Sequence, residues 1–304
     1  MPFAYSELFQ PAAKFDAPGF PTIANLDGNG LLFEWEVTRS RTGEADTGMV
    51  SIYNLSPALS GQIQERASNT GLLELFTVTF SIGWQQQTAE LITGDLWRVV
   101  PNLRPSATDV VTQLHIGDGL QNLRDAQMGL NVTSIAFSAF LLQAITAPIN
   151  AGDIGGGGLG LKIRTADRAF IKQRVTSLNL QQLSNSPAFG STKQAIDWLM
   201  ATLGLEWRVQ NGFFIPMQGG INNDPAIELS PNSGLIGYAK RDDGGITLTA
   251  LAIPEVQPGL RIVVRDEKGL NVDAPLYRVD TVSFTGSTQG ESIMAIEAER
   301  ARLV

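Results

Sequence analysis

Apolar and polar residues alternate with a two-residue period through much of the first third of the chain. In residues 49–54, for example, Val50 and Ile52 share one face of an extended chain. Because β-branched and aromatic residues favour a pleated, half-buried surface, segments with this pattern are predicted to be strands. The predicted strands are residues 31–40, 49–54, 75–82, 88–100 and 109–116.

A short helix is predicted between the second and third of these strands. Ser56 offers a side-chain oxygen to cap the helix, and Pro57 suits its first position, where a backbone N–H would have no partner. Leu59, Ile63 and Ala67 recur at four-residue spacing and would form one apolar stripe. We therefore expect this helix to lie on the sheet.

The middle of the chain mixes helical and extended patterns. A helix of apolar character is predicted from Ser134 to Ile145, and an amphipathic helix is predicted from Ser191 to a stop at Gly204. The basic residues between Lys162 and Arg174 lie in a weakly alternating segment, which favours a solvated or subunit-facing strand. Stacking on nucleic acid is not expected there, because Phe170 is the only aromatic residue among them.

The last third returns to short strands separated by Gly and Pro. Asn211-Gly212 is the strongest two-residue hairpin signal of the chain and separates the apolar runs 205–210 and 213–217. Regular spacing of the strands that follow predicts a second small barrel. These strands are residues 227–229, 245–251, 259–264, 277–285 and 292–299.

Several short phrases occur in a fixed order along the chain: Val50-Ser51-Ile52-Tyr53-Asn54-Leu55-Ser56, Thr93-Gly94-Asp95-Leu96, Leu114-His115-Ile116-Gly117-Asp118-Gly119, Leu203-Gly204-Leu205-Glu206-Trp207-Arg208-Val209, Ser233-Gly234-Leu235-Ile236-Gly237 and Leu251-Ala252-Ile253-Pro254-Glu255-Val256-Gln257-Pro258-Gly259. The order of these phrases resembles the baseplate hub (tail hub) proteins of long-tailed bacteriophages. The resemblance covers the chain from about Phe33 to the C-terminus, and its specific part is the order of the phrases. It departs from the family at Gly286-Ser287-Thr288-Gln289-Gly290-Glu291-Ser292-Ile293, where many relatives read roughly G-D-T-x-G-x-x-W.

This resemblance implies a mainly β fold with a few helices, in which two small tube-protein-like β-barrels flank a mixed α/β middle domain. The expected domains are an N-terminal arm at 1–30, a first barrel with an inserted helix at 31–118, a middle domain with a Gly-rich loop at 119–225 and a second barrel at 226–304. The arm either frays or packs on a neighbouring subunit.

The resemblance also implies a structural virion protein: a homotrimeric hub at the distal end of the tail tube, around the channel for DNA ejection. It would act as a symmetry adaptor between a sixfold tube and a threefold tip or spike. The implied partners are the tube or the adjacent distal tail ring protein, the tip or spike protein, the tape measure protein and other baseplate proteins. The expected place is the tail baseplate of the virion, after assembly in the host cytoplasm.

Composition limits the chemistry that the chain can perform. The chain of 304 residues has no Cys and one His, which excludes disulfides, thiolate nucleophiles and cysteine-ligated metals. Its net charge of −8 does not favour a sequence-independent grip on phosphates, and no sequence-specific nucleic-acid binding is expected either. The most apolar segment, 135–149, is interrupted by polar residues, so no membrane span is expected either, and the N-terminus lacks the features of a signal peptide.

The candidate catalytic groups favour an interpretation without catalysis. His115 would have to serve any Ser-His-Asp triad, but it lies in an alternating strand. Glu34 and Glu36 share a strand face, and Asp242 and Asp243 adjoin in a loop; such pairs could serve a glycosidase, although solvated surface acids explain them better. No catalytic, cofactor-binding or metal-binding residue is therefore assigned, and no cofactor is expected.

Two features have both a structural and a functional interpretation. Six of the nine residues from Gly152 to Gly160 are glycine, but the Lys-Ser/Thr of a P-loop is missing, so a flexible loop is expected. Of the tryptophans, only Trp84 is expected in an exposed loop; Trp35, Trp97, Trp198 and Trp207 occupy core-like positions. A tail-tip peptidoglycan hydrolase and a receptor-binding tail protein stay open as alternatives to the hub.

Overall fold

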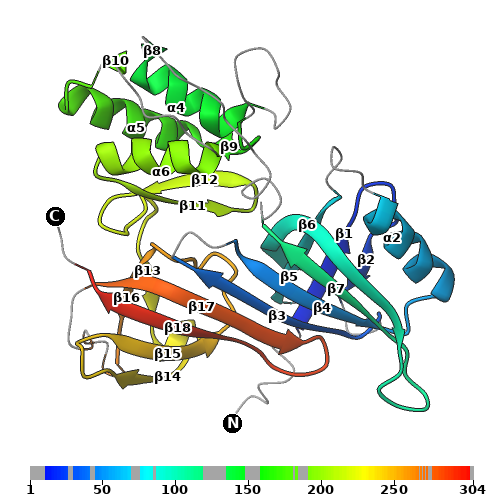
Figure 1. Ribbon diagram of the computed structural model, residues 1–304. Helices are drawn as coiled ribbons and strands as arrows, with labels where there is room; N and C mark the ends of the chain where they lie inside the picture. Colours follow the sequence, from blue (N-terminus) through cyan, green and yellow to red (C-terminus); the bar gives the residue numbers. More distant parts are fainter. Residues whose placement is uncertain are drawn as a thin grey trace. The chain divides into compact units, whose positions relative to one another are not determined.

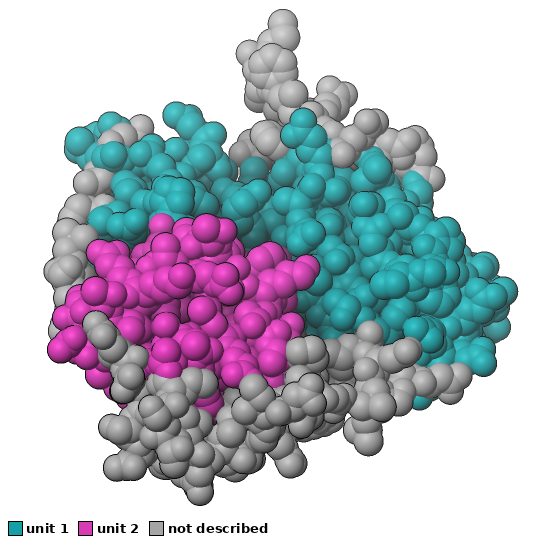
Figure 2. Space-filling model, turned by 90° about the horizontal axis from the view of Figure 1, so that it is seen from above, with its two compact units in different colours: residues 1–41, 46–118, 224–303 teal, residues 42–45, 119–223, 304 magenta. Residues whose placement is uncertain are grey.

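The chain forms two compact units in the computed structural model, shown in two colours in Figure 2. Unit 1 contains residues 1–41, 46–118 and 224–303, and unit 2 contains residues 42–45, 119–223 and 304. The structure describes residues 11–26, 30–41, 45–69, 76–84, 87–118, 135–147, 158–180, 182–183, 191–266, 268, 270, 272 and 276–301.

Unit 1 is built on one large, mainly antiparallel sheet with two modules (Figure 1). The first module comprises β1 (Pro11–Asp16), β2 (Ile23–Asn25), β3 (Phe33–Ser40), β4 (Thr47–Tyr53), α2 (Pro57–Asn69), β5 (Thr77–Trp84), β6 (Gln87–Leu103) and β7 (Val111–Gly117). The second module comprises β13 (Ile227–Leu229), η2 (Pro231–Ser233), β14 (Leu235–Lys240), β15 (Ile246–Leu251), β16 (Arg261–Val264), β17 (Tyr277–Ser287) and β18 (Ser292–Arg300).

The two modules join where β3 pairs with β17. The strand order along the main path is β14-β15-β18-β17-β3-β4-β7-β6-β5-β1-β2, and β16 branches from β17 to pair with β13. At the junction Val37 lies opposite Phe284 and Glu36 lies opposite Thr285. Strands far apart in the sequence therefore form one continuous hydrogen-bonded surface.

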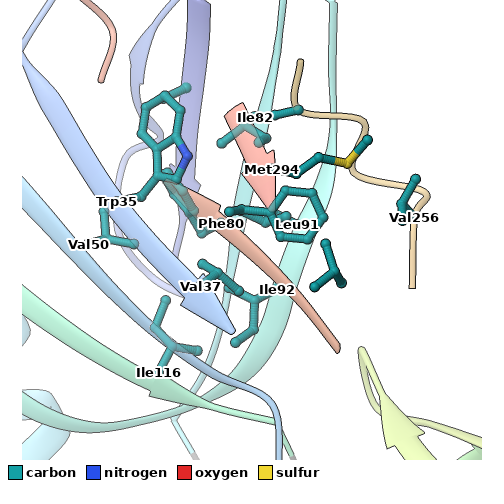
Figure 3. Close-up of a cluster of buried hydrophobic side chains, with 14 of the residues drawn as sticks. Trp35, Val37, Val50, Phe80, Ile82, Leu91, Ile92, Ile116, Val256 and Met294 are labelled. Carbon is teal, nitrogen blue, oxygen red and sulfur yellow. The ribbon is translucent and has the colours of Figure 1, made fainter. Parts of the chain in front are cut away.

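Both modules share one hydrophobic core. Figure 3 shows Phe80 and Leu91 of the first module close to Val256 and Met294 of the second. All four side chains are at most 1% exposed, so separating the modules would expose apolar surface at a cost of roughly 25 cal/mol per Å². The shared core therefore holds the modules together in addition to the strand pairing.

The predicted helix between the second and third strands is confirmed as α2. Ser56 Oγ accepts a hydrogen bond of 3.3 Å from the backbone N–H of Leu59, as the capping argument predicts. Ile63 is fully buried, and Leu59 and Ala67 are partly buried against the core. The four-residue apolar stripe therefore places this helix on the sheet.

Unit 2 has a separate core between helices and a small sheet. Its elements are β8 (Ile135–Ala136), α4 (Phe137–Thr146), β9 (Lys162–Ile163), α5 (Thr165–Ser177), β10 (Gln182–Leu183), α6 (Thr192–Thr202), β11 (Glu206–Gln210) and β12 (Phe213–Met217). Ser191 caps α6 by accepting from Gln194 N–H, and the Asn211-Gly212 hairpin is confirmed, with both residues at positive φ. Within the described residues, no helix is long and apolar enough to cross a bilayer.

The prediction of a strand in the basic segment is wrong, because residues 165–177 form helix α5. Ile171 and Val175 are buried at helical spacing, whereas Arg168 and Lys172 are exposed. Asp167 is fully buried and accepts hydrogen bonds from the guanidinium of Arg164. The helical period is carried by few apolar residues, which is why the sequence pattern was weak.

The expected class, mainly β with a few helices, is confirmed. Two details differ from the sequence interpretation. Within the expected N-terminal arm, a short strand was expected at 22–24 and is present as β2, but residues 11–16 form a further strand, β1, which pairs with β5 in the sheet; β14 was not predicted at all. The strand order described for residues 11–301 is an open path with a branch, so closure of each module into a barrel stays a prediction, as do the four domain bounds.

Candidate functional site

The side of the sheet opposite the core forms a broad, mostly polar surface that spans both modules. We call the solvent-facing side of strands β6, β7, β4, β3, β17 and β18 the outer face. One row of cross-strand neighbours runs over it from Ile293 through Thr285, Glu36 and Met49 to His115. Side chains alternate between the two faces of a strand, so the residues on either side of each of these positions point into the core.

Trp97 and His115 form an aromatic pair on the outer face. Trp97 is 53% exposed, and its ring centroid lies 5.2 Å from that of His115, with the planes tilted by 52°. Partial burial, and then the nearby charge of Arg98, lower the pKa of His115 below its ordinary value. His115 thus has the predicted place on a sheet face.

The prediction that Trp97 occupies a core-like position is wrong. The pairing of β6 with β7 shifts register between Leu96 and Arg98, so the strand carries a bulge at Trp97. A bulge inserts one unpaired residue and re-aims the side chains around it. Leu96 is consequently buried while Trp97 points to solvent.

The outer face has two shallow hollows, and Met49 lines both of them. One is lined by Glu36, Trp97 and His115 among others, and the second by Glu34, Tyr53 and Leu103 among others. The two acids that share a strand face therefore border different hollows. Their side chains present charge to solvent rather than to one common substrate position.

One carboxylate of each candidate pair, Glu34 and Asp243, has an ordinary structural partner. Tyr53 donates a hydrogen bond of 2.6 Å to Glu34 Oε2, and this contact is the main cause that raises the pKa of Tyr53 to about 12. Asp243 accepts from the backbone N–H of Gly245 at 2.9 Å, and this bond together with Arg241 lowers the pKa of Asp243. A general acid needs a raised pKa, so Asp243 has the opposite tuning.

Trp84 does not lie in a loop, contrary to the sequence interpretation. It is the last residue of β5 and half-buried, and its indole N–H donates a hydrogen bond of 3.4 Å to the carbonyl of Ala252. Trp35 is buried as predicted, and Trp198 and Trp207 are half-buried. The receptor-binding alternative therefore loses the exposed aromatic that suggested it.

A buried arginine ties the two modules together and was missed by the sequence analysis. Arg39 is 1% exposed, and its Nη1 donates to the carbonyls of Pro254 at 2.8 Å and Val256 at 3.0 Å. Its Nη2 donates to the carbonyl of Leu91, and its guanidinium lies over the ring of Phe284. The alternation of the strand could have indicated its burial, since Arg39 follows two core residues, Trp35 and Val37, at two-residue spacing and so lies on the same face.

The Gly-rich segment that was weighed as a phosphate cradle is described only from Gly158 onward. Residues 151–157 lie outside the described part of the chain. Gly158 is buried against the carbonyls of Gln143 and Ala147, where an added Cβ would approach within 2.6 Å, so it needs its missing side chain for packing. Among the described residues there is also no group of three or more His, Asp or Glu arranged to hold a metal ion.

Comparison with known proteins supports the fold. No protein-family model and no curated protein matches this sequence. Solved structures with a similar fold include a tail protein from Neisseria meningitidis MC58, with 12% identity, a TM-score of 0.55 and coverage of 96% of this chain and 97% of that one. The 43 kDa tail protein of prophage MuSo2 from Shewanella oneidensis is 11% identical, with a TM-score of 0.56 and coverage of 95% and 96%.

A third similar structure comes from a secretion system. The E. coli c3393 protein is described as a component of the type VI secretion system with structural similarity to the T4 bacteriophage tail proteins gp27 and gp5. It is 10% identical to this chain, with a TM-score of 0.55 and coverage of 95% of this chain and 77% of that one. At these identities, the likeness establishes that the chain shares the fold of phage tail proteins over nearly its whole length.

Proposed function

We propose that this chain is a structural component of a phage-type tail and forms its hub. The observation that carries the proposal is the union of two β modules in one sheet and one core, through β3 and β17. The fold likeness to tail proteins from two bacterial genomes supports the same role.

In the proposed hub, three copies surround the tail axis. A closed ring forms when identical head-to-tail contacts repeat around an axis. Since each copy carries two β modules, three copies present six modules to a sixfold tube, while the ring as a whole keeps threefold symmetry for a tip or spike. The copies would thereby adapt one symmetry to the other.

A symmetry adaptor needs its two modules held at a fixed relationship. Three kinds of contact supply this rigidity: the β3–β17 ladder, the shared core, and hydrogen bonds such as those from Arg39 to Pro254 and Val256. A buried cation that loses its partners is strongly destabilising, so this joint resists opening. We infer that the modules move as one body when the tail changes conformation.

The outer face suits a wall along which a polyanion slides. Its exposed side chains include the acids Glu36 and Glu297, hydroxyl residues such as Thr285, and the cation Arg98 beside His115. Each chain has a net charge of −8, so three copies carry three times −8, or −24. Acids on a channel wall would repel DNA from it and prevent binding.

No catalytic step is part of this proposal. Glu34 is engaged by Tyr53, and the pKa of Asp243 is lowered rather than raised, so neither suits a general acid. The partners in the proposed assembly are the tube or an adjacent distal ring protein, a tip or spike protein, the tape measure protein and other baseplate proteins.

A reconstruction of the intact particle tests the proposal. We expect three copies at the distal end of the tube, with the two modules of each copy alternating around the axis. One copy per particle, or a position away from the axis, would contradict the hub. A purified monomer that clears a suspension of bacterial cell walls would favour a tail-tip peptidoglycan hydrolase instead.

A further inference from the structure

The two modules of unit 1 repeat one strand order. In the first module β3, β4, β7 and β6 lie side by side with β5 beyond β6, and in the second β14, β15, β18 and β17 lie side by side with β16 beyond β17 (Figure 1). The five strands also follow one another in the same order along the chain. Each strand therefore has a counterpart in the other module: β14 corresponds to β3, and β17 corresponds to β6.

A bulge fixes which residues correspond. The pairing of β6 with β7 shifts register just before Arg98, and the pairing of β17 with β18 shifts register just before Thr281. The two bulges lie in counterpart strands, so Arg98 takes the place of Thr281. Two residues later, Val100 takes the place of Ser283.

The correspondence extends across the sheet to β3 and β14. Cross-strand neighbours form matching rows that lead to Glu36 of β3 and to Ala239 of β14. Arg241, two residues after Ala239, therefore takes the place of Thr38. The rows are Arg98, His115, Met49 and Glu36 in the first module, and Thr281, Glu297, Thr247 and Ala239 in the second.

Strands β17 and β3 pair within the chain, whereas their counterparts β6 and β14 have open edges. In the pairing within the chain, Ser283 lies opposite Thr38, and their hydroxyl oxygens are 3.4 Å apart. On β6, the pairing with β5 ends at Asp95, so residues 97–103 have one neighbour, β7, among the strands that the structure describes. On β14, the only described neighbour is β15, apart from the turn that precedes it. A single copy therefore leaves open the two edges that the repeat would join.

Each open edge carries an apolar side chain on its core side that is not fully covered. Tyr238 of β14 lies opposite the buried Leu248 and is 44% exposed. Val99 of β6 packs against the core but is half-buried. At the junction within the chain, by contrast, Val37 and Phe284 are fully buried. A neighbouring strand at each open edge would cover Tyr238 and Val99 in the same way.

Helix α2 lies under the sheet and leaves the edge of β6 accessible. Thr112 of β7 is buried opposite Ile52, and its hydroxyl oxygen lies 2.9 Å from that of Ser60 in the helix. Ile63 of the helix is fully buried in the same core. In the second module the segment between β15 and β16 has the corresponding place along the chain, and β17 still pairs with β3.

The two open edges also carry opposite charges at corresponding positions. Asp243, in the turn after β14, takes the place of Ser40 and would face Arg98 of a neighbouring copy. Arg98 and Asp243 are both exposed. The junction within the chain has an ion pair at this level, because Arg41 Nε lies 3.0 Å from Asp280 Oδ1. Opposite charges on facing strands stabilise a pairing, whereas like charges destabilise it.

We propose that β14 of one copy pairs antiparallel with residues 98–103 of β6 in the next copy, with Arg241 opposite Val100 and Asp243 facing Arg98. This pairing rests on the proposed hub, in which three copies surround one axis. Each copy offers one edge and receives one, and such a head-to-tail contact closes into a ring. Pro101 removes one N–H from the ladder, so the joint between copies is weaker than the joint within a chain.

Engineered cysteines test the pairing, since the chain has no native Cys to interfere. Val100→Cys and Arg241→Cys are combined in one chain, which is then oxidised in assembled tails. Facing residues of paired strands have Cβ atoms about 4.5–5.5 Å apart, close to what a disulfide requires. We expect closed sets of three linked chains on a denaturing, non-reducing gel. The matched control, Val100→Cys with Ala295→Cys on the exposed side of β18, should give at least about tenfold fewer links.

The outcomes separate the pairing from the hub itself. Unlinked chains in tails that hold three axial copies would overturn the pairing and leave the hub standing. Tails without three axial copies would overturn both. Linked pairs in the single variant Arg241→Cys would show that two β14 strands meet each other, which also overturns the pairing.

A charge exchange tests the facing pair in the same cysteine background. Arg98→Asp places two acids opposite each other and should lower the yield of linked trimers by about fivefold or more. Adding Asp243→Arg restores opposite charges and should recover most of the yield. The matched control adds Glu255→Arg, an exposed acid outside both strands, and should recover none of it. Equal recovery with Asp243→Arg and Glu255→Arg, or no loss with Arg98→Asp, would contradict the proposed register.

Discussion

Arg39 of β3 donates a hydrogen bond of 3.0 Å to the carbonyl of Val256, a residue of the second module 217 positions later in the chain. The same guanidinium reaches Leu91 of β6 and lies 3.9 Å from Asp46 Oδ2. One buried side chain therefore connects the β3 and β6 strands of the first module with the loop after β15. Where the two modules meet, the polar contacts of Arg39 are therefore surrounded by the apolar side chains of the shared core.

Replacement of this arginine should weaken unit 1 as a whole. Arg39→Met keeps much of the apolar stem but removes the donors to three carbonyls and leaves Asp46 without the cation, so we expect a loss of about 3–5 kcal/mol in the free energy of unfolding. Denaturant unfolding followed by tryptophan fluorescence measures the loss. Arg98→Met, at an exposed strand position, is the control and should change the free energy by less than about 0.5 kcal/mol. Similar losses for both variants would contradict the role of Arg39.

Gly286 in the last hairpin leaves no room for a Cβ unless its neighbours shift. An added Cβ at Gly286 would lie 2.6 Å from Cζ2 of Trp35, which it faces across the β3–β17 ladder. Gly286→Ala should therefore cost about 1–3 kcal/mol of unfolding free energy through overpacking. The control is Gly61→Ala in α2, where nothing lies within 4 Å and the helix should gain about 0.5–1 kcal/mol. Thermal unfolding of the two variants should shift in opposite directions; a neutral Gly286→Ala would mean that Trp35 moves freely.

The elements that were predicted correctly from the sequence have local signals. The helix α2 has a cap and an apolar stripe within thirteen residues, and the hairpin at Asn211-Gly212 needs only two residues at positive φ. Such signals act within a few positions along the chain, so neighbouring residues suffice to read them. The residues of β3 that face the core were predictable for the same reason.

The elements that were missed depend on partners distant in sequence. The β3–β17 junction joins residues about 250 positions apart, and nothing near either strand specifies the other. Trp97 was placed in the core because a bulge, which only the pairing with β7 reveals, breaks the alternation. The buried role of Arg39 likewise depends on carbonyls from both modules. The candidate surface could be predicted as a set of strand faces but not as one continuous face.

The titration of His115 should be visible in the pH dependence of stability. The pKa of His115 is lower in the folded protein than in the unfolded chain, so the unfolded chain binds the proton more readily. The free energy of unfolding should therefore fall as the pH decreases from above about 6.5, the pKa of His in the unfolded chain, through the pKa of His115 in the folded protein. The His115→Gln variant should lose this contribution. The test compares unfolding midpoints of both proteins at pH 7.5 and 5.5. A steeper loss in the variant than in the wild type would contradict the direction of the shift.

Charge on the outer face should affect DNA passage if this face lines the channel of the proposed hub. Glu36→Lys together with Glu297→Lys reverses two exposed charges on this face in each copy, while Asp242→Lys changes an exposed turn and serves as the control. Both side chains point away from the core, so the particles should assemble normally. Lysines on the wall would bind phosphates, and ejection of DNA in vitro should slow by on the order of tenfold at low salt and recover at high salt, because screening weakens such contacts.

Ejection at the wild-type rate at every salt concentration would show that the outer face lies elsewhere, against a neighbouring protein or toward the exterior of the tail. A reduced number of assembled tails, in contrast, would place the two acids in a contact between copies. The outcome therefore decides which surface of the sheet the DNA meets.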